Sequence, residues 1–561
     1  MSGTDAPRAG ATAGVELHCN DRSTVVHSGE SLFDYAERLG VFVPTSCIKQ
    51  GKCKECLVEV VEGMEHLSPR TEAEKHLQDA FRLSCQTRLQ DATGVVRYHT
   101  MRRGDMRIER HALHLPVGHG TAPLDPCVTR DGERILLDGV EIDRTTGPIH
   151  GLAVDLGTTT VVARLFDLET GEAVADASFE NPQRFGGSDV MSRISWDTGH
   201  PGKLLQRTLA AYLGHAIEEF PVDPRSIYEV VVAGNSTMRD LFFRLNVYSI
   251  GQNPYQSVTE LDLTAGTRTT TSLTANARRH HLPANPRARM YGLPIVSGHV
   301  GADAAACMLA VDMAHEQRLV AVMDIGTNTE LIVGNRDRIL AASCPAGPAF
   351  EGGKILFGMP GLPGAIEKVR ILPDGSIRTS VIGDVPPEGI CGSGLVDILG
   401  ELLRTGRMNS LGRLDDGASE VVVDSRGDRP IVLRESDINE LAQAKGANVA
   451  GLHIVMDRYG LRFEDLDVFY LAGGFGRHLD VASAKRIGLI PDIADAKILQ
   501  VGNAAIEGAS IALLSAAKRR ELEQMVGRVT HCRLESHPDF FHYFVEGCQF
   551  QPVQTRKPHD A

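Results

Sequence analysis

Two stretches of this sequence share one pattern: GLAVDLGTTTVVARLFD at residues 151–167 and LVAVMDIGTNTELIVGN at residues 319–335. Each consists of an apolar strand, an aspartate (Asp155 or Asp324), a Gly-Thr turn and a second apolar strand. Self-similarity at long spacing is typical of related structural units. The sequence therefore predicts two related lobes, each built around a β-hairpin.

The turn of each hairpin has the chemistry of a phosphate site. Backbone N–H groups and threonine hydroxyls can surround a phosphate, and an aspartate at a strand end can hold Mg²⁺, usually through water. A single turn of this kind could serve only to connect the two strands of its hairpin. Two matching turns favour a site in which a nucleotide is held from both sides. Asp155 and Asp324 are predicted to serve Mg²⁺ or to orient water at the γ-phosphate. The predicted phosphate contacts are Gly157, Thr158, Thr159, Gly326, Thr327 and Asn328.

A third motif, VFYLAGGFGRHLD at residues 468–480, runs from a strand into a glycine-rich loop. Glycines allow the backbone to approach a flat ring or a sugar closely, so Gly473, Gly474 and Phe475 are predicted to lie beside the adenosine. Two segments rich in small residues, 297–311 and 501–515, read as helices. They indicate either close helix packing or a hinge between the lobes.

Four of the 11 cysteines fall close together near the N-terminus, in the pattern C-x5-C-x2-C-x28-C. Three thiolates on one loop and a fourth from a distant segment are typical of a ferredoxin iron–sulfur cluster. A four-cysteine zinc site is the alternative, but it usually shows two C-x2-C pairs and this sequence has one. The predicted cluster ligands are Cys47, Cys53, Cys56 and Cys85.

The segments around these cysteines predict a β-grasp fold. A strand hairpin at 14–28, a helix from about 30 to 39, the cysteine loop and a strand at 57–61 follow one another. Residues 15–95 are therefore interpreted as a [2Fe-2S] ferredoxin-type domain. The other predicted boundaries are a disordered tail at 1–14, a linker at 96–148, a first lobe at 149–315, a second lobe at 316–551 and a tail at 552–561.

The order of hairpin, small-residue helix, hairpin, glycine loop and small-residue helix resembles the superfamily of actin, sugar kinases and heat-shock chaperone ATPases (ASKHA). The resemblance covers about residues 150–551 and implies two RNase H-like lobes that close on ATP. The predicted fold class is thus a multidomain α/β protein, with an N-terminal β-grasp ferredoxin domain followed by a two-lobed RNase H-like domain.

A [2Fe-2S] ferredoxin ahead of an ASKHA domain looks like the reductive activators of corrinoid proteins. VVAGNSTMRDLF (231–242), SCPAGPAFEGGKI (343–355), ICGSGLVDIL (390–399) and HPDFFHYFVEGCQF (537–550) also resemble that family. The resemblance implies ATP-dependent, one-electron reduction of Co(II) to Co(I) in a corrinoid protein of a methyltransferase system. It further implies a [2Fe-2S] cluster, ATP with Mg²⁺, an unidentified low-potential electron donor and a possible homodimer.

Composition excludes several other classes. With 58 basic and 72 acidic residues the net charge is −14, which disfavours unspecific nucleic-acid binding. No run approaches the ~20 apolar residues of a membrane span, and the N-terminus lacks the features of a secretory signal, so a cytoplasmic protein is expected.

Two alternatives use the same domains. One is an ASKHA small-molecule kinase with a fused regulatory ferredoxin, and the other is a redox sensor that binds nucleotide without turnover. An activator of radical dehydratases is disfavoured. A resemblance to that family would imply a homodimer bridged by one [4Fe-4S] cluster, with two cysteines from each subunit, whereas this sequence offers four cysteines in one domain.

Overall fold

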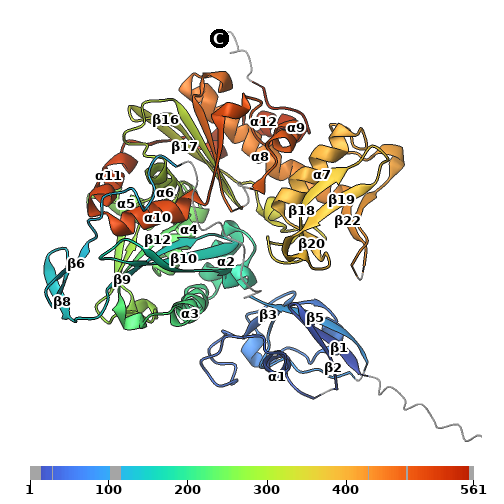
Figure 1. Cartoon of the computed structure of the whole chain (residues 1–561), viewed down its shortest axis with the longest axis horizontal. Helices are drawn as coiled ribbons and strands as arrows, with labels where there is room; N and C mark the ends of the chain where they lie inside the picture. The colour runs from blue at the N-terminus through green and yellow to red at the C-terminus, as the bar shows by residue number, and fades with distance from the viewer. Residues whose placement is uncertain are drawn as a thin grey trace, which may run out of the picture. The chain divides into compact units, whose positions relative to one another are not determined.

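The computed structural model describes residues 14–27, 29–91, 93–101, 115–427, 429–474 and 478–554 (Figure 1). The chain divides into two compact units, Met1–Gly104 and Asp105–Ala561. The predicted tails lie almost wholly outside the described residues, as does Phe475. None of the helices in the described ranges has the length and apolarity needed to cross a lipid bilayer.

The smaller unit is a five-stranded sheet with one helix. Its strand order is β2 (Arg22–Val26), β1 (Val15–Cys19), β5 (Gly94–Thr100), β3 (Leu57–Glu62) and β4 (Phe81–Leu83). The first strand pairs antiparallel with β2 and parallel with β5, which is the β-grasp arrangement. Helix α1 (Leu32–Arg38) begins after Ser31, whose side chain and that of Asp34 form a capping box.

The larger unit contains two six-stranded sheets that share a plan of five strands and differ in the place of the sixth. The first has the order β11 (Ala173–Glu180), β10 (Thr160–Asp167), β9 (His150–Leu156), β12 (Ile227–Gly234), β14 (Arg289–Gly292) and β13 (Leu273–Asn276). The second has the order β24 (Ile498–Gly502), β23 (Val468–Ala472), β15 (Val320–Ile325), β16 (Thr329–Asn335), β17 (Arg338–Cys344) and β25 (Thr530–His531).

In both sheets the quoted hairpin pairs antiparallel, and its first strand lies parallel to a later strand: β9 to β12, and β15 to β23. The two related lobes predicted from the repeat are therefore present, and the predicted fold class is confirmed.

Helices α6 (Ala302–Ala310) and α10 (Ala504–Leu514) are packed against each other in a core that includes residues of both sheets (Figure 1). Both helices are wholly or almost wholly buried, which explains why their sequences are rich in alanine and glycine. A Cβ on Gly508 would lie 2.0 Å from the carbonyl oxygen of Ala306, so glycine is required at this crossing.

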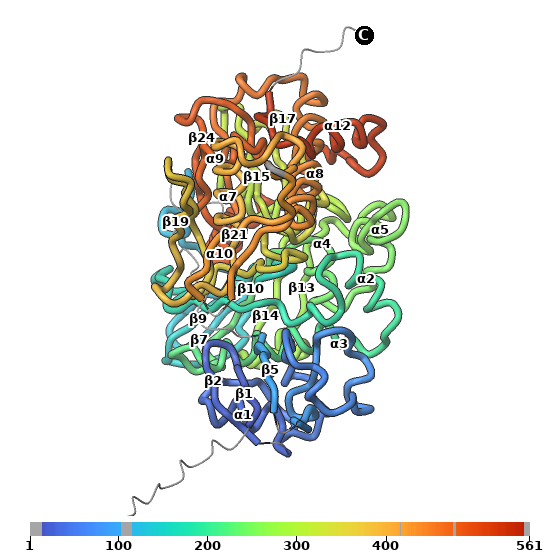
Figure 2. The backbone as a smooth tube through the Cα atoms, turned by 90° about the vertical axis from the view of Figure 1, so that its right-hand side faces the viewer, coloured from blue at the N-terminus to red at the C-terminus, as the bar shows by residue number. Residues whose placement is uncertain are grey.

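Other helices cover the outer faces of the lobes. Helix α8 (Glu435–Tyr459) packs against α12 (Phe540–Gly547), and the two lie side by side in both views (Figures 1 and 2). The remaining helices are α2 (Val190–Gly199), α3 (Leu204–Glu218), α4 (Ser236–Phe242), α5 (Val258–Thr264), α7 (Gly392–Arg404), α9 (Val481–Ile487) and α11 (Ala516–Val526). Two small sheets extend the second lobe: β18 (Ala365–Ile371), β19 (Ile377–Val381) and β20 (Gly389–Ile390), and β21 (Glu420–Asp424) with β22 (Ile431–Arg434).

The segment predicted as a linker, 96–148, differs from that prediction where it is described. Strand β5 extends to Thr100 as part of the ferredoxin-type sheet. A three-stranded sheet follows later, β6 (Val128–Asp131), β7 (Arg134–Leu137) and β8 (Val140–Arg144), and Val128 and Ile135 are fully buried in the core of the larger unit. Strands this short show little hydrophobic periodicity, because their burial depends on a neighbouring surface. For this reason the sequence of the segment resembled a linker.

Candidate functional site

The four predicted cluster cysteines lie near one another in the smaller unit. Because β3 pairs with β4, Cys56 before one strand is brought beside Cys85 after the other, and their sulfur atoms are 3.2 Å apart. Cys56 and Cys85 are buried, whereas Cys47 and Cys53 are half-buried on the connecting loop.

The loop that carries Cys47 and Cys53 bends sharply. Ile48, Lys49, Gly51 and Lys54 have positive φ angles of 50°, 61°, 68° and 68°. These bends direct backbone amides toward sulfur: burial raises the pKa of the Cys47 thiol, but hydrogen bonds led by that from the Cys53 amide outweigh it and hold the pKa below its ordinary value.

This donor set fits an iron–sulfur cluster. Four thiols from one loop and one adjoining strand end provide the ligands, and amides directed at sulfur stabilise thiolates. A cluster at this site would be held by Cys47, Cys53, Cys56 and Cys85.

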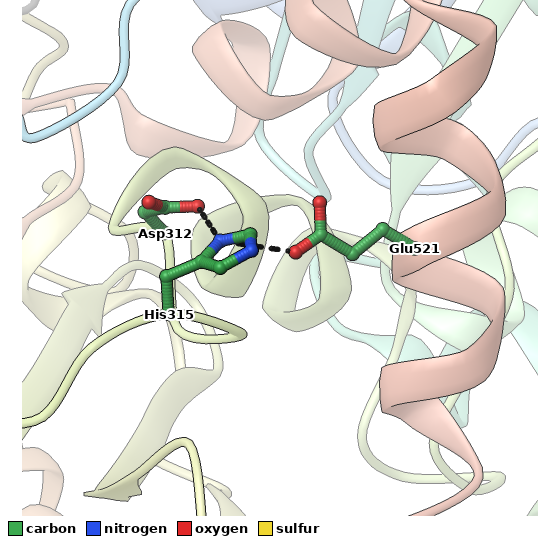
Figure 3. Close-up of side chains that lie close together, drawn as sticks. All are labelled: Asp312, His315 and Glu521. Carbon is green, nitrogen blue, oxygen red and sulfur yellow. Dashed lines mark hydrogen bonds and ion pairs between the residues drawn. The ribbon is translucent and has the colours of Figure 1, made fainter.

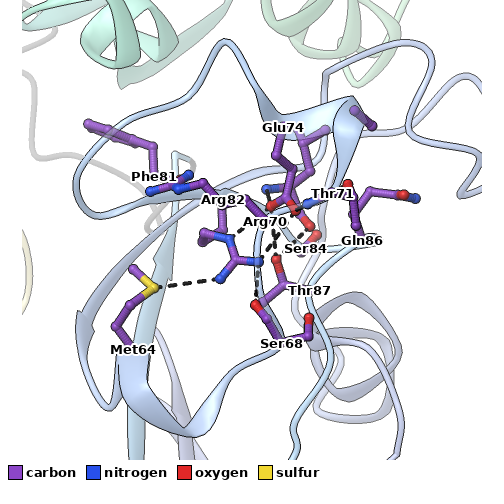
Figure 4. A network of polar contacts seen from close by, with 12 residues as sticks. Met64, Ser68, Arg70, Thr71, Glu74, Phe81, Arg82, Ser84, Gln86 and Thr87 are labelled. Carbon is purple, nitrogen blue, oxygen red and sulfur yellow. Dashed lines mark hydrogen bonds and ion pairs between the residues drawn. The ribbon is translucent and has the colours of Figure 1, made fainter.

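A buried ion pair supports the segment that ends in Cys85 (Figure 4). Arg82 donates from Nε to Glu74 Oε1 at 2.9 Å, and both side chains are almost fully buried. The same carboxylate accepts the backbone N–H of Leu83 at 3.1 Å and the Thr87 hydroxyl at 3.2 Å. Glu74 thus holds the backbone before the fourth cysteine and the Thr87 side chain after it.

One cavity in the larger unit, with a volume of about 230 Å³, is lined by all the described residues that were predicted to contact the nucleotide. Both hairpin turns and the glycine loop after β23 contribute to its wall. Gly473 has a φ of +108° and approaches β15 so closely that a Cβ would lie 2.3 Å from the Ile325 carbonyl oxygen. The predicted residues in the lining are Asp155, Gly157, Thr158, Thr159, Asp324, Gly326, Thr327, Asn328, Gly473 and Gly474.

The two hairpin turns meet inside this cavity. The hydroxyl oxygens of Thr159 and Thr327, one from each lobe, are 3.0 Å apart. Both hydroxyls donate to one carboxylate oxygen of Glu351, at 3.0 Å from Thr159 and in a shorter contact from Thr327. The threonines of both predicted phosphate turns therefore share a single acceptor.

Several carboxyl groups are enclosed by the cavity. Burial raises the pKa of Asp155 to about 6 and the pKa of Asp324 to about 7, and each carboxylate has one neutral donor. Asn503 Nδ2 donates to Asp155 at 2.9 Å, and the Cys307 thiol donates to Asp324 at 3.3 Å. Among the described residues, neither carboxyl group has a basic side chain as its hydrogen-bond partner. Such desolvated carboxyl groups favour a bound cation, and Mg²⁺ is the hard cation that carboxylates take.

Sequence reasoning missed two asparagines of this cavity. Asn235 donates to the Thr158 hydroxyl at 3.0 Å, and Asn503 contacts Asp155 as described above. Each asparagine caps a helix directly after a strand and a glycine, in AGNS (233–236) and VGNA (501–504). This second repeat is visible in the sequence and was the signal available for both residues.

Four more polar residues at the cavity wall or behind it had no comparable signal. Glu351 follows β17, Glu330 lies on β16 and Asp303 on α6, and all three line the cavity. Arg193 is fully buried and donates to the Thr158 carbonyl oxygen at 2.6 Å.

A separate cluster of titratable side chains lies on the larger unit (Figure 3), and none of its three members lines the cavity. His315 Nδ1 is 3.0 Å from Asp312 and 3.1 Å from Glu521. Lys518 Nζ lies 2.9 Å from Asp312 and 3.0 Å from Glu521. Since this ammonium group already compensates both carboxylates, the cluster is an ion-pair network.

Family models match the chain in three consecutive ranges. The 2Fe-2S iron-sulfur cluster binding domain matches residues 15–90, the RACo middle region matches 150–316, and the C-terminal domain of RACo, the ASKHA domain, matches 318–559. The three matches follow the domain order described above.

Two curated proteins are similar in sequence. The corrinoid activation enzyme RamQ of Eubacterium limosum is 29% identical, over 93% of this chain and 97% of that protein. The [Co(II) methylated amine-specific corrinoid protein] reductase of Methanosarcina barkeri is 24% identical, over 71% of this chain and 76% of that protein. A solved structure, the reductive activator for corrinoid,iron-sulfur protein, aligns with a TM-score of 0.71 and 27% identity, over 96% of this chain and 98% of that chain.

Proposed function

We propose, on the premise that this chain belongs to the family of reductive activators of corrinoid proteins, that it reduces the Co(II) of a corrinoid protein to Co(I) in an ATP-dependent step. The corrinoid protein would serve a methyltransferase system. The observation that carries the proposal is the presence, in one chain, of a four-thiol loop and of a two-lobed cavity with facing Gly-Thr turns.

In the smaller unit, Cys47, Cys53, Cys56 and Cys85 would hold a [2Fe-2S] cluster, which supplies a one-electron carrier when bound. The loop amides directed at Cys47 would stabilise its thiolate form, and Glu74 would hold the backbone that presents Cys85. A low-potential donor would supply each electron. Free thiols at all described cysteines suit a reducing compartment such as the cytoplasm.

In the larger unit, ATP would lie between the two hairpins. Gly157, Thr158 and Thr159 of the first turn and Gly326, Thr327 and Asn328 of the second would contact the phosphates. Asp155 and Asp324 would hold Mg²⁺ through water, and their enclosed negative charge supports a cation there.

ATP can promote a difficult reduction only by binding one arrangement of the protein more tightly than another. The hairpins come from different lobes and meet at Thr159 and Thr327, so a ligand gripped by both would favour a closed arrangement. We propose that this closure favours the state of the partner complex in which Co(II) is more easily reduced. A homodimer would be compatible with this scheme.

The test is anaerobic purification with iron and sulfide analysis, followed by a spectroscopic assay of a Co(II) corrinoid protein with a chemical reductant. We expect about two irons and two sulfides per chain and Co(I) formation that requires ATP. A reaction without this protein and one with the β,γ-imido analogue of ATP are the controls. Iron-free protein, or Co(I) formation at the same rate and extent without ATP, would contradict the proposal.

A further inference from the structure

Glu351 occupies a distinctive place in the cavity. It is the last residue of the short helix η7 (Pro348–Glu351), which follows β17 of the second sheet. Its carboxylate nevertheless contacts both lobes, because it accepts the hydroxyl of Thr159 from the first and the hydroxyl of Thr327 from the second. One acidic group therefore lies where both phosphate-binding turns converge.

The other enclosed carboxylates occupy different positions. Asp155 and Asp324 lie near the ends of β9 and β15, below the turns, where they contact Asn503 and Cys307. Glu330 lies on β16 and accepts the Ser343 hydroxyl at 2.9 Å. Of these described carboxylates, Glu351 is the one that accepts hydrogen bonds from the threonines of both turns.

A carboxylate in this position is poorly suited to contact phosphate, since the two negative charges repel each other. It is well suited to accept a proton from a water molecule beside the phosphate. Burial raises the pKa of Glu351 above its ordinary value, which makes the carboxylate a stronger base, while the charge of Arg193 acts in the opposite direction.

We propose that Glu351 is the general base for ATP hydrolysis; this inference rests on the proposed function. Thr159 and Thr327 donate to the terminal phosphate when ATP is bound, and the released carboxylate accepts a hydrogen bond from a water molecule. The water oxygen forms a bond to the γ-phosphorus as Glu351 takes the proton. The bond from that phosphorus to the bridging oxygen breaks, and ADP leaves with the bonding electron pair.

The test compares the full-length wild type with Glu351→Gln, which keeps the shape and both threonine acceptor contacts but cannot take the proton. Binding is measured with the β,γ-imido analogue of ATP, and turnover is measured as phosphate release from ATP. We expect binding to change less than about 3-fold and phosphate release to fall at least ~100-fold, as for loss of a general base. Glu440→Gln, at a half-buried glutamate near Lys354 and outside the cavity lining, is the matched control and should retain both activities.

Wild-type turnover in Glu351→Gln would overturn the inference, and so would loss of analogue binding in a variant that melts at the wild-type temperature. If the glutamine variant fails to fold, Glu351→Asp replaces it. We expect this variant to bind the analogue and to hydrolyse ATP at least ~10-fold more slowly, because its shorter carboxylate lies farther from the water. Hydrolysis at the wild-type rate would overturn the base role. A wild type that binds ATP without hydrolysing it would overturn this inference alone. A wild type that binds no ATP would overturn the proposed function itself.

Discussion

The cysteine loop and the cavity between the two hairpins are assembled in opposite ways. The four cysteines span 47–85 and are brought together by one loop and one strand pair. The cavity joins residues from both lobes, so that Asn503 contacts Asp155 across 348 positions of the chain. A local site depends on the chemistry of a few neighbouring residues, whereas a dispersed site depends on the fold of the whole unit.

This contrast predicts that the two sites can be lost separately, and the largest effect is expected at the cysteines. Cys56→Ser replaces a buried ligand that lies 3.2 Å from Cys85, and it should abolish the visible absorption of the cluster and the reduction of Co(II). Binding of ATP should remain within about 2-fold. Cys532→Ser, at a buried cysteine of the larger unit, is the control for the substitution itself. Loss of ATP binding in Cys56→Ser would contradict the separation of the two sites.

A smaller effect is expected from the buried Arg82–Glu74 ion pair beside the cysteine site. Glu74→Ala leaves Arg82 buried without its carboxylate, and breaking such a pair costs about 3–5 kcal/mol. We expect urea to remove the cluster absorption at a lower concentration, while fluorescence of Trp196, which lies in the larger unit, changes at the wild-type concentration. Glu72→Ala, at a surface pair with Lys75, should change neither midpoint. A shift of the Trp196 transition by the same amount would show that the units unfold together.

At the dispersed site a single charge should matter less. Asp324→Asn removes one of several enclosed carboxylates, and we expect it to raise the Mg²⁺ concentration needed for ATP binding about 10-fold, without changing the cluster absorption. Titration with Mg²⁺ at fixed ATP measures this change. The control is Asp312→Asn in the ion-pair network outside the cavity, which should leave the Mg²⁺ requirement as it is. If Asp324→Asn needed the same Mg²⁺ concentration as the wild type, the assignment of Asp324 to the Mg²⁺ site would be wrong.

The sequence was informative where a site is local or repeated. The cysteine spacing predicted the ferredoxin-type domain, and the repeated hairpins predicted the two lobes. Glu351 was missed because nothing near it in the sequence shows that Thr159, 192 positions earlier, lies beside it. Residues 128–144 were read as part of a linker because the surface that buries Val128 and Ile135 comes from distant segments.

A further prediction concerns the pH dependence of stability. Burial lowers the pKa of His531 to about 4, so the unfolded chain takes up a proton near the ordinary histidine pKa of 6.5 while the folded chain does not. Stability of the larger unit should therefore decline as the pH falls from about 6.5 to about 4, by up to ~1 kcal/mol per pH unit from this residue. His531→Gln should make the Trp196 unfolding midpoint less dependent on pH in that range. A dependence equal to that of the wild type would exclude His531 as its source.

The crossing of α6 and α10 at Gly508 and Ala306 has a mechanical consequence. At this point the backbone of one helix lies directly against the backbone of the other, because neither residue carries a side chain larger than a methyl group. A larger residue at position 508 would force α6 and α10 apart and would disturb the core that residues of both sheets share.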